Sequence, residues 1–229
     1  MHDTALIIMA RYPEAGKTKT RLARTLGPEK VAGLYRAFLT DLARRFAGPQ
    51  YALHWAYTPA EVDYQAFVQT LAPEQAQYMH SFPQQGSDFG ARLLAAFQWT
   101  YDHGYQRTVL IGSDSPQIGH ELVAQAETAL DDSDVVLGPA DDGGYYLIAM
   151  RHPHDVFSDI PMSTDVVARM TVEAAARQNL TTRLLDPLFD IDELPDLLRL
   201  AHLLDANSDL APETALYLNH VLSLDLRSF

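Results

Sequence analysis

Short apolar runs alternate with helical segments along the first 140 residues of this 229-residue chain. The runs at residues 4–10 and 108–111 contain few polar side chains, which is typical of parallel strands buried on both faces of a sheet. The helical segments are amphipathic, most clearly at residues 28–46, where apolar residues recur at helical spacing. This alternation predicts an α/β fold, a three-layer αβα sandwich around a mixed, mostly parallel sheet.

The same pattern assigns approximate bounds to each element. Strands are expected at residues 4–10, 51–57, 77–82, 108–111, 134–137, 145–150 and 182–185. Helices are expected from Arg21 onward and at residues 28–46, 60–71, 91–101, 121–130, 166–177, 197–204 and 212–224. The glycine-containing loop at residues 138–144 joins its two strands directly rather than through a helix.

The composition is that of an ordinary globular protein, with 47% hydrophobic and 21% charged residues. No repeat or long linker divides the chain, so residues 1–229 are expected to form a single domain. No apolar run approaches the roughly 18–20 residues that span a bilayer, and residues 1–10 lack the features of a secretory signal. Because there is no cysteine, a cytoplasmic location is expected. The net charge of −13 argues against nonspecific binding of nucleic acids or anionic membranes.

Basic residues are concentrated directly after the first strand. Lys17 and Lys19 lie with Arg11, Arg21 and Arg24 within a short segment of a chain that has 17 basic residues in all. Arginine binds phosphate oxygens through a planar fork, and lysine binds them as a point charge. The segment therefore predicts an anion site, with a solvated surface as the alternative.

The basic segment also resembles half of a P-loop. The tripeptide Gly16-Lys17-Thr18 matches the end of the motif G-x-x-x-x-G-K-[ST]. Arg11, however, stands where the first glycine is required, and Pro13 lacks an amide donor. A P-loop ATPase or kinase is therefore disfavoured.

Three aspartates are candidates for binding a divalent cation. Asp114 follows the apolar run 108–111, at the edge where open α/β sheets bind ligands. Asp190 and Asp192 project from one side of an extended segment, since side chains alternate along it. Mg²⁺ typically takes one or two carboxylates together with water and substrate phosphates. Capping of the helix that follows is the alternative for each of these carboxylates.

Two further loops carry polar groups. The first, at residues 86–92, offers Ser87, Asp88 and backbone amides at an expected helix start, for which a plain helix cap is the simpler explanation. The second, at residues 141–146, combines two carboxylates with two glycines and two tyrosines. The glycines permit close approach of the backbone to a ligand, and the polar groups suit a sugar or a hydroxyl acceptor. A tight Asp-Gly hairpin is the alternative.

Five motifs together resemble a known family. They are MARYPEAGKTKTRLA at residues 9–23, GSDFGARL at 86–93, LIGSDSP at 110–116, LGPADDGGYYL at 137–147 and DIDELPDL at 190–197. In this combination and order the chain resembles a bacterial family of glycosyltransferase-A-like proteins related to the 2-phospholactate guanylyltransferases. The resemblance implies a nucleotide-diphospho-sugar transferase (GT-A) fold that binds a nucleotide at the carboxyl ends of its first strands.

The resemblance also implies roles for individual residues. Asp114 would hold Mg²⁺ (or Mn²⁺), with Asp192 as the second ligand and Asp190 as its alternative. The basic loop would meet the phosphates, and residues 86–88 would lie near the base. The residues expected to bind the nucleotide are Arg11, Gly16, Lys17, Lys19, Arg21, Gly86, Ser87, Asp88, Ser113, Gly143, Gly144 and Tyr145.

These features predict a Mg²⁺-dependent transferase. In glycosyl transfer from a nucleotide-sugar, the favoured prediction, Asp141 or Asp142 would orient or deprotonate the hydroxyl of a small-molecule acceptor. In nucleotidyl transfer, the alternative, Lys17 or Lys19 would stabilise charge as a substrate phosphate attacks the α-phosphate of a nucleoside triphosphate. A noncatalytic nucleotide-binding protein is the third hypothesis, and the oligomeric state is left open.

Overall fold

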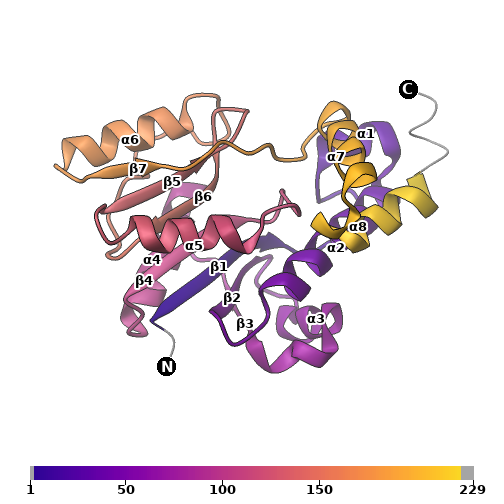
Figure 1. The fold of residues 1–229 in the computed structure, drawn as a ribbon, viewed down its shortest axis with the longest axis horizontal. Coiled ribbons are helices and arrows are strands. Elements are labelled where there is room, and N and C mark those ends of the chain that lie inside the picture. Colours follow the sequence, from indigo (N-terminus) through magenta and orange to yellow (C-terminus); the bar gives the residue numbers. More distant parts are fainter. Residues whose placement is uncertain (1–2, 223–229) are drawn as a thin grey trace.

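Seven strands form one sheet in the computed structural model, which describes residues 3–222 (Figure 1). The strands are β1 (Thr4–Arg11), β2 (Ala52–Thr58), β3 (Met79–Pro83), β4 (Arg107–Gly112), β5 (Val135–Pro139), β6 (Tyr145–Met150) and β7 (Thr182–Leu184). Their order across the sheet is β3-β2-β1-β4-β6-β5-β7. Only β6 pairs antiparallel with its neighbours, β4 and β5, and the other neighbouring strands run parallel. The predicted mixed, mostly parallel sheet is confirmed.

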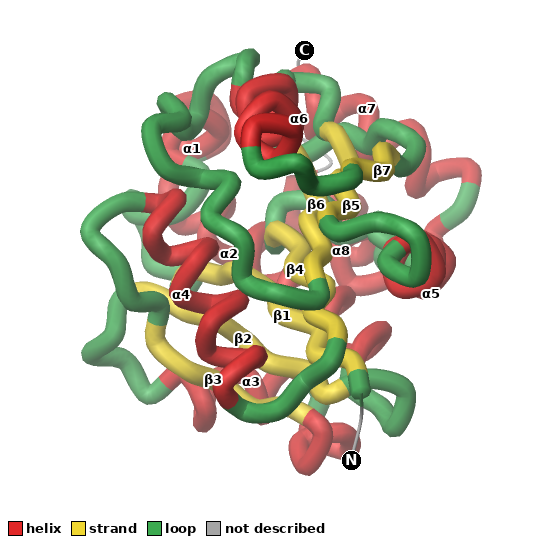
Figure 2. The backbone as a smooth tube through the Cα atoms, turned by 90° about the vertical axis from the view of Figure 1, so that its left-hand side faces the viewer, coloured by secondary structure: helices red, strands yellow, loops and turns green. Residues whose placement is uncertain are grey.

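Helices cover both faces of this sheet. They are α1 (Thr20–Leu26), α2 (Pro28–Phe46), α3 (Tyr64–Leu71), α4 (Phe89–Asp102), α5 (His120–Ala129), α6 (Val167–Arg177), α7 (Leu194–Ala206) and α8 (Pro212–Tyr217). Because side chains alternate along β1, Leu6 and Ile8 pack into the core beneath α2, whereas Ile7 and Met9 pack into a second core beneath α4. Figure 2 shows α4 lying across the strands on the side nearer the viewer. The predicted three-layer αβα architecture is confirmed.

Three helix boundaries differ by three residues or more from those that the periodicity predicts. α3 begins at Tyr64, four residues late, because the side chain of Asp63 accepts a hydrogen bond from the first turn and caps the helix there. α7 begins at Leu194, three residues early, because the Asp196 carboxylate accepts a hydrogen bond from the backbone just before it. α8 ends at Tyr217 and is followed by a π-helical turn, while residues 223–224 of the predicted helix lie outside the described residues. No helix among residues 3–222 is long and apolar enough to cross a membrane.

A buried histidine on β2 makes stability depend on pH. His54 is 5% exposed and hydrogen-bonds Tyr105 Oη through Nε2 (2.9 Å). Burial lowers the pKa of His54 from 6.5 to about 4, with help from the positive charges that His80 and His103 acquire. At pH values between about 4 and 6.5, His54 is therefore protonated in the unfolded chain but neutral in the folded chain. The folding stability that the neutral ring provides is complete above pH 6.5 and is lost as the pH falls towards 4.

The expected loss of unfolding free energy from His54 between pH 7 and pH 4.5 is about 2–3 kcal/mol. His54→Phe keeps a buried ring but removes the titrating group, so its stability should fall less steeply over this interval. Urea denaturation of both proteins at a series of pH values measures the two slopes. Equal slopes for wild type and variant would show that His54 does not titrate as its burial implies.

Candidate active site

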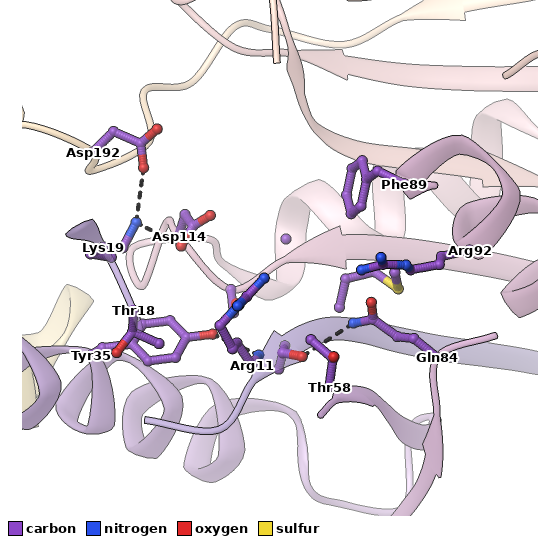
Figure 3. A pocket seen from close by; sticks show the side chains of 14 residues that line it. Arg11, Thr18, Lys19, Tyr35, Thr58, Gln84, Phe89, Arg92, Asp114 and Asp192 are labelled. Atoms are coloured by element: carbon purple, nitrogen blue, oxygen red, sulfur yellow. Dashed lines mark hydrogen bonds and ion pairs between the residues drawn. The ribbon is translucent and has the colours of Figure 1, made fainter. Parts of the chain in front are cut away.

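A cavity of about 250 Å³ opens at the carboxyl ends of β1, β2 and β4 (Figure 3). Its lining comes from Met9, Ala10, Arg11, Thr18, Lys19, Tyr35, Thr58, Gln84, Phe89, Arg92, Gly112, Ser113, Asp114 and Asp192. This is the edge of the sheet at which open α/β folds bind their ligands. Five of the residues predicted to bind nucleotide or metal are brought together here: Arg11, Lys19, Ser113, Asp114 and Asp192.

One wall of the cavity is built around the ammonium group of Lys19. Its Nζ lies 2.6 Å from Asp114 Oδ1 and 3.1 Å from Asp192 Oδ1, and its side chain is only 4% exposed. Burial by itself would lower the pKa of Lys19, but the two carboxylates outweigh burial and raise the pKa above its ordinary value. Lys19 also has a left-handed backbone (φ 43°, ψ 54°), which is uncommon outside glycine and recurs at functional sites.

Backbone contacts between distant segments bring the two aspartates together. Asp114 follows β4 directly, and its carbonyl oxygen accepts a hydrogen bond from Ile191 N (3.1 Å). The carbonyl oxygen of Phe189 accepts hydrogen bonds from Ser115 Oγ (3.1 Å) and Gln117 Nε2 (2.7 Å). These contacts tie the segment before α7 to the turn after β4.

Neither Asp114 nor Asp192 caps a helix, which was the alternative to metal binding for both residues. α5 begins after Gly119, five residues beyond Asp114. The first turn of α7 is capped through Asp196, whose Oδ2 accepts from Glu193 N (2.8 Å). The carboxylates of Asp114 and Asp192 therefore face Lys19 and the cavity.

Asp190 lies beside this pair but does not line the cavity. Burial, followed by the negative charges of Asp142 and Asp192, raises its pKa from 3.8 to about 6. Of the two aspartates in this segment, Asp192 is therefore the one that shares a partner with Asp114. Asp190 adds negative charge near Asp114 and Asp192 without lining the cavity.

Two arginines present their side chains to the cavity, Arg92 from the wall opposite the carboxylates and Arg11 from the middle, between Asp114 and Arg92 (Figure 3). Within the described residues, the side chains of Arg11 and Arg92 form no hydrogen bond or ion pair, and Figure 3 shows both guanidinium groups directed into the cavity. The Gln84 amide nitrogen donates to the carbonyl oxygens of Ala10 (3.2 Å) and Ala56 (2.9 Å). Its Oε1 is thereby left as a fixed acceptor next to Arg92. This wall offers cationic donors and one oriented acceptor.

A buried hydroxyl pair forms the floor between the walls. Tyr35, on α2, is 3% exposed, and its Oη lies 2.7 Å from Ser113 Oγ and accepts a hydrogen bond from Arg11 N (3.1 Å). Burial, together with the negative charge of Asp114, raises the pKa of Tyr35 to about 12, so the phenol stays protonated. The helical periodicity of residues 28–46 places Tyr35 on the apolar face of α2, but it carries no information about the partners of its hydroxyl group.

The rest of the predicted basic loop lies outside the cavity. Lys17 is largely exposed and pairs with Glu14 (2.9 Å), so the prediction that it contacts the reacting groups is not supported by its position. Gly16 occupies an open turn at φ 79°. Arg21 approaches Asp192 (3.8 Å) from the rim without lining the cavity. Arg11 and Lys19 are the basic residues of this loop that line the cavity.

The residues predicted to bind nucleotide at 86–88 and 143–145, together with Asp141 and Asp142, do not line the cavity, and most of them form turns. Asp88 Oδ1 accepts from Ala91 N (2.9 Å) and caps α4, as the simpler explanation of that loop has it. Ser87 is exposed beside it and bonds its carboxylate. Gly86 (φ 138°) makes the tight turn before α4, where a Cβ would collide with the helix backbone. None of residues 86–88 lines the cavity, and their expected position near the base of a nucleotide stays a prediction.

The loop between β5 and β6 is a tight hairpin, the alternative to a substrate-binding loop in the sequence analysis. Asp141 pairs with Arg199 of α7 (2.6 Å), and Asp142 Oδ1 accepts from Gly144 N (2.8 Å). Gly143 (φ 89°) packs so closely on the backbone of Asp165 that no Cβ would fit. None of these residues lines the cavity.

Tyr145, which was predicted to bind the nucleotide, also lies apart from the cavity. Its side chain packs into the core beneath α4 and α6, on β6, and burial raises its pKa well above the usual range. The side chain is partly buried against this core and does not line the cavity. Its apolar ring, on a strand buried on both faces, explains this placement.

The donor set fits a magnesium ion only as part of a larger complex. Among the described residues no group of three or more histidine, aspartate or glutamate side chains is arranged to hold a metal. Asp114 and Asp192 supply two carboxylates close enough for one nitrogen atom to contact both. Mg²⁺ is commonly bound by one or two carboxylates, with water and substrate phosphates completing its octahedron. The pair therefore fits Mg²⁺ that arrives with a phosphate ligand.

Residues 43–164, more than half of the chain, match the model of a family described as "Uncharacterized protein conserved in bacteria (DUF2064)". The chain belongs to this family. The matched region contains β2 to β6 and therefore includes Gln84, Arg92 and Asp114 of the cavity. It does not include Lys19 or Asp192.

Solved structures and a curated relative extend the comparison of this DUF2064 protein. A crystal structure from Desulfovibrio desulfuricans G20, described as a "putative nucleotide-diphospho-sugar transferase", is 37% identical, with a TM-score of 0.89 over 100% of this chain and 98% of that one. The 2-phospho-L-lactate guanylyltransferase of Methanothermobacter thermautotrophicus is 27% identical over 66% of this chain. The chain spans 63% of the length of that curated relative.

A cytidylyltransferase from Leptospira borgpetersenii shares the fold alone, with a TM-score of 0.55 at 13% identity over 92% of this chain and 97% of that one. The predicted family resemblance and the predicted nucleotide-diphospho-sugar transferase fold are confirmed. The relatives carry the names of transferase enzymes, in agreement with the class predicted for this chain.

Proposed function

We propose that this DUF2064 protein is a Mg²⁺-dependent nucleotidyltransferase that joins a nucleoside triphosphate to a phosphorylated small molecule. The observation that carries the proposal is the opposition of two walls in one cavity. Asp114 and Asp192 lie on one side, Arg92 lies on the other and Arg11 lies between them, and neither guanidinium group is paired within the described residues (Figure 3). A polyphosphate with its cation satisfies both walls, because its oxygens suit the arginines and its metal suits the carboxylates.

Each residue has a defined task in this proposal. Arg11 and Arg92 bind phosphate oxygens and offset the negative charge that develops as the leaving group departs. Gln84 Oε1 accepts a hydrogen bond from the nucleotide. Asp114 and Asp192 would hold Mg²⁺, which when bound neutralises phosphate charge. An oxygen of the acceptor's phosphate bonds to the α-phosphorus, the bond from that phosphorus to the β-phosphate oxygen breaks, and pyrophosphate leaves with the electron pair.

The hairpin side chains favour nucleotidyl over glycosyl transfer. The favoured prediction from the sequence needs Asp141 or Asp142 to orient an acceptor hydroxyl. Asp141 is held by Arg199, and Asp142 by the backbone of its own turn. Nucleotidyl transfer needs no such base, since the acceptor's phosphate is already ionised at neutral pH. Glycosyl transfer remains the second candidate, supported by the name of the Desulfovibrio structure, which is 37% identical.

A panel of ligands tests the proposal. Each of the four nucleoside triphosphates and their common nucleotide-sugars is added with and without Mg²⁺, and the unfolding midpoint is measured. A ligand at 100 times its dissociation constant should stabilise the protein by about 2.7 kcal/mol. A Mg²⁺-dependent shift with one triphosphate, followed by pyrophosphate release with phosphorylated acceptors, is the expected result. A shift with a nucleotide-sugar alone would favour glycosyl transfer, and no shift with any ligand would refute both.

Arg92→Met is expected to raise the KM for the nucleoside triphosphate about 10–100-fold, because a charge-assisted contact to phosphate contributes about 1.5–3 kcal/mol. Methionine keeps most of the length of the side chain but not its charge. Steady-state kinetics across nucleotide concentrations give the change. Arg177→Met, which removes an exposed arginine from the end of α6, is the matched control. A KM for Arg92→Met within threefold of the control would exclude Arg92 from the nucleotide site.

A further inference from the structure

Lys19 occupies the position between the two carboxylates that a bound metal would need. Its Nζ contacts one oxygen of Asp114 (2.6 Å) and one of Asp192 (3.1 Å). The lysine side chain is 4% exposed, whereas the side chains of Asp114 and Asp192 are 47% and 41% exposed. The carboxylates thus reach the open cavity, but their shared side is closed by a buried cation.

We infer that Lys19 is the resident cation of this carboxylate pair, and that a divalent metal enters only together with a phosphate-bearing ligand that takes over the ammonium group. The inference rests on the proposed function, since it concerns the same metal and nucleotide. It goes beyond that function because it assigns Lys19 a role that phosphate binding alone does not require. The role is to keep the metal site closed until a nucleotide is present.

Electrostatics supports mutual exclusion at this position. An ammonium and a divalent cation placed on the same two oxygens repel each other, and the low local dielectric around a buried side chain strengthens the repulsion. In the absence of another anion, no alternative partner among the described residues competes with Asp114 and Asp192 for the ammonium group of Lys19, so it remains between them. Of the neighbouring hydroxyls in the cavity, Thr18 donates to Glu14 O (2.9 Å), and Tyr35 is engaged with Ser113 (2.7 Å).

A nucleotide changes this balance by supplying the missing anion. Arg11 and Arg92 are unpaired in the described structure and are directed into the same cavity (Figure 3), so they can retain a polyphosphate beside Lys19. Lysine carries its charge on a flexible four-carbon stem, and a small rotation can move Nζ from a carboxylate to a phosphate oxygen. The carboxylates are then free to bind the metal. Metal and nucleotide must therefore increase each other's affinity by the same factor.

Mn²⁺ alone provides the first test, because free and bound Mn²⁺ are distinguished by electron paramagnetic resonance without any catalysis. Wild type, Lys19→Met and Lys17→Met are titrated with Mn²⁺ in the absence of nucleotide. Lys17→Met removes the same charge from the same loop, but Lys17 pairs with Glu14 outside the cavity. We expect Lys19→Met to bind Mn²⁺ at least tenfold more tightly than wild type and the Lys17 variant to stay within threefold. No gain in Lys19→Met would overturn the inference.

Further variants locate the gained site and guard against misfolding. Adding Asp114→Asn to Lys19→Met should abolish the gain, whereas a gain that persists would place the metal elsewhere and refute the inference. Lys19→Gln should behave like Lys19→Met, and Lys19→Arg, which keeps the charge, should resemble wild type. Circular dichroism melting shows which variants are folded, and either neutral variant is sufficient for the comparison.

A second titration separates this inference from the proposed function. Mn²⁺ binding is repeated with the triphosphate that gives the largest thermal shift. In wild type the nucleotide should tighten Mn²⁺ binding by a larger factor than in Lys19→Met, where the site is already open. If no triphosphate binds at all, the proposed function fails, while the titrations with Mn²⁺ alone still decide the role of Lys19. Equal factors in both proteins would show that Lys19 does not couple the two ligands.

Discussion

Asp114→Asn is expected to lower the turnover number of the proposed nucleotidyl transfer by about 10²–10³-fold, the range found when one element of electrostatic stabilisation is removed from an active site. Asparagine preserves the shape of the side chain but removes its negative charge. Lys19 would then retain only Asp192 as an ionic partner, and one of the two carboxylates suited to Mg²⁺ would be lost. The Mg²⁺-dependent thermal shift with nucleotide should disappear together with the activity.

The fold should survive this change, because the Asp114 side chain is half-exposed and packs in no apolar core. Asp131→Asn is the matched control: it makes the same chemical change at the opposite ends of the strands, where Asp131 pairs with Arg107 (2.5 Å). Pyrophosphate release under saturating nucleotide gives the rates of both variants. An Asp114→Asn protein that retains more than a tenth of the wild-type rate would show that this carboxylate is not part of the reacting site.

Asp41→Ala is expected to lower the free energy of unfolding by about 2–4 kcal/mol, through three lost hydrogen bonds and the donors left unpaired. Asp41 is a buried residue of α2 whose carboxylate accepts hydrogen bonds from Glu213 N (2.9 Å), Thr214 N (2.9 Å) and Thr214 Oγ1 (2.6 Å). It therefore caps α8 from a different helix. Figure 1 shows α8 lying beside α2, at the end of the molecule where α1 and α7 also gather.

Urea denaturation measures this loss, and limited proteolysis should detect release of α8 at lower urea than in wild type. Asp209→Ala removes an exposed carboxylate from the turn just before α8 and should change stability by less than about 0.5 kcal/mol. A loss below 1 kcal/mol for Asp41→Ala would mean that the contact between α2 and α8 contributes little to the folded state.

The predictions from the sequence were most accurate where residues act through their own segment. The apolar run before Asp114 predicts a buried strand, and a residue that follows such a strand lies at the ligand-binding edge of the sheet wherever the chain goes next. The alternation along residues 190–192 indicated Asp190 and Asp192 together, and the family resemblance favoured Asp192. Asp114 and Asp192 both line the cavity. The hairpin after β5 was also among the structures that the sequence predicted, because the preference of Asp-Gly for a tight turn depends only on neighbouring residues.

Predictions failed where a side chain's partner lies far away in the sequence. Asp141 was expected to meet a substrate, but Arg199, 58 residues later, pairs with it. Arg92 lies in a motif that the resemblance singled out, yet nothing in its neighbourhood indicates that α4 directs it into the cavity opposite Asp114. Arg92 lies in the first turn of a helix that follows a strand. This pattern is too common to distinguish an arginine of a binding site from an arginine on the surface.

Local patterns in the sequence specify the α/β class of this protein, the approximate bounds of its strands and helices, and the edge of the sheet at which the cavity opens. These features follow from the periodicity of apolar residues and from strand ends, which are properties of a few consecutive residues. Which charges are paired and which are free among the described residues depends instead on how the chain folds in space. Lys19 and Asp192 are 173 residues apart, and their contact exists only because the strands bring both segments to one edge. The pairing of charges depends on distances in space, and a local pattern carries no information about them.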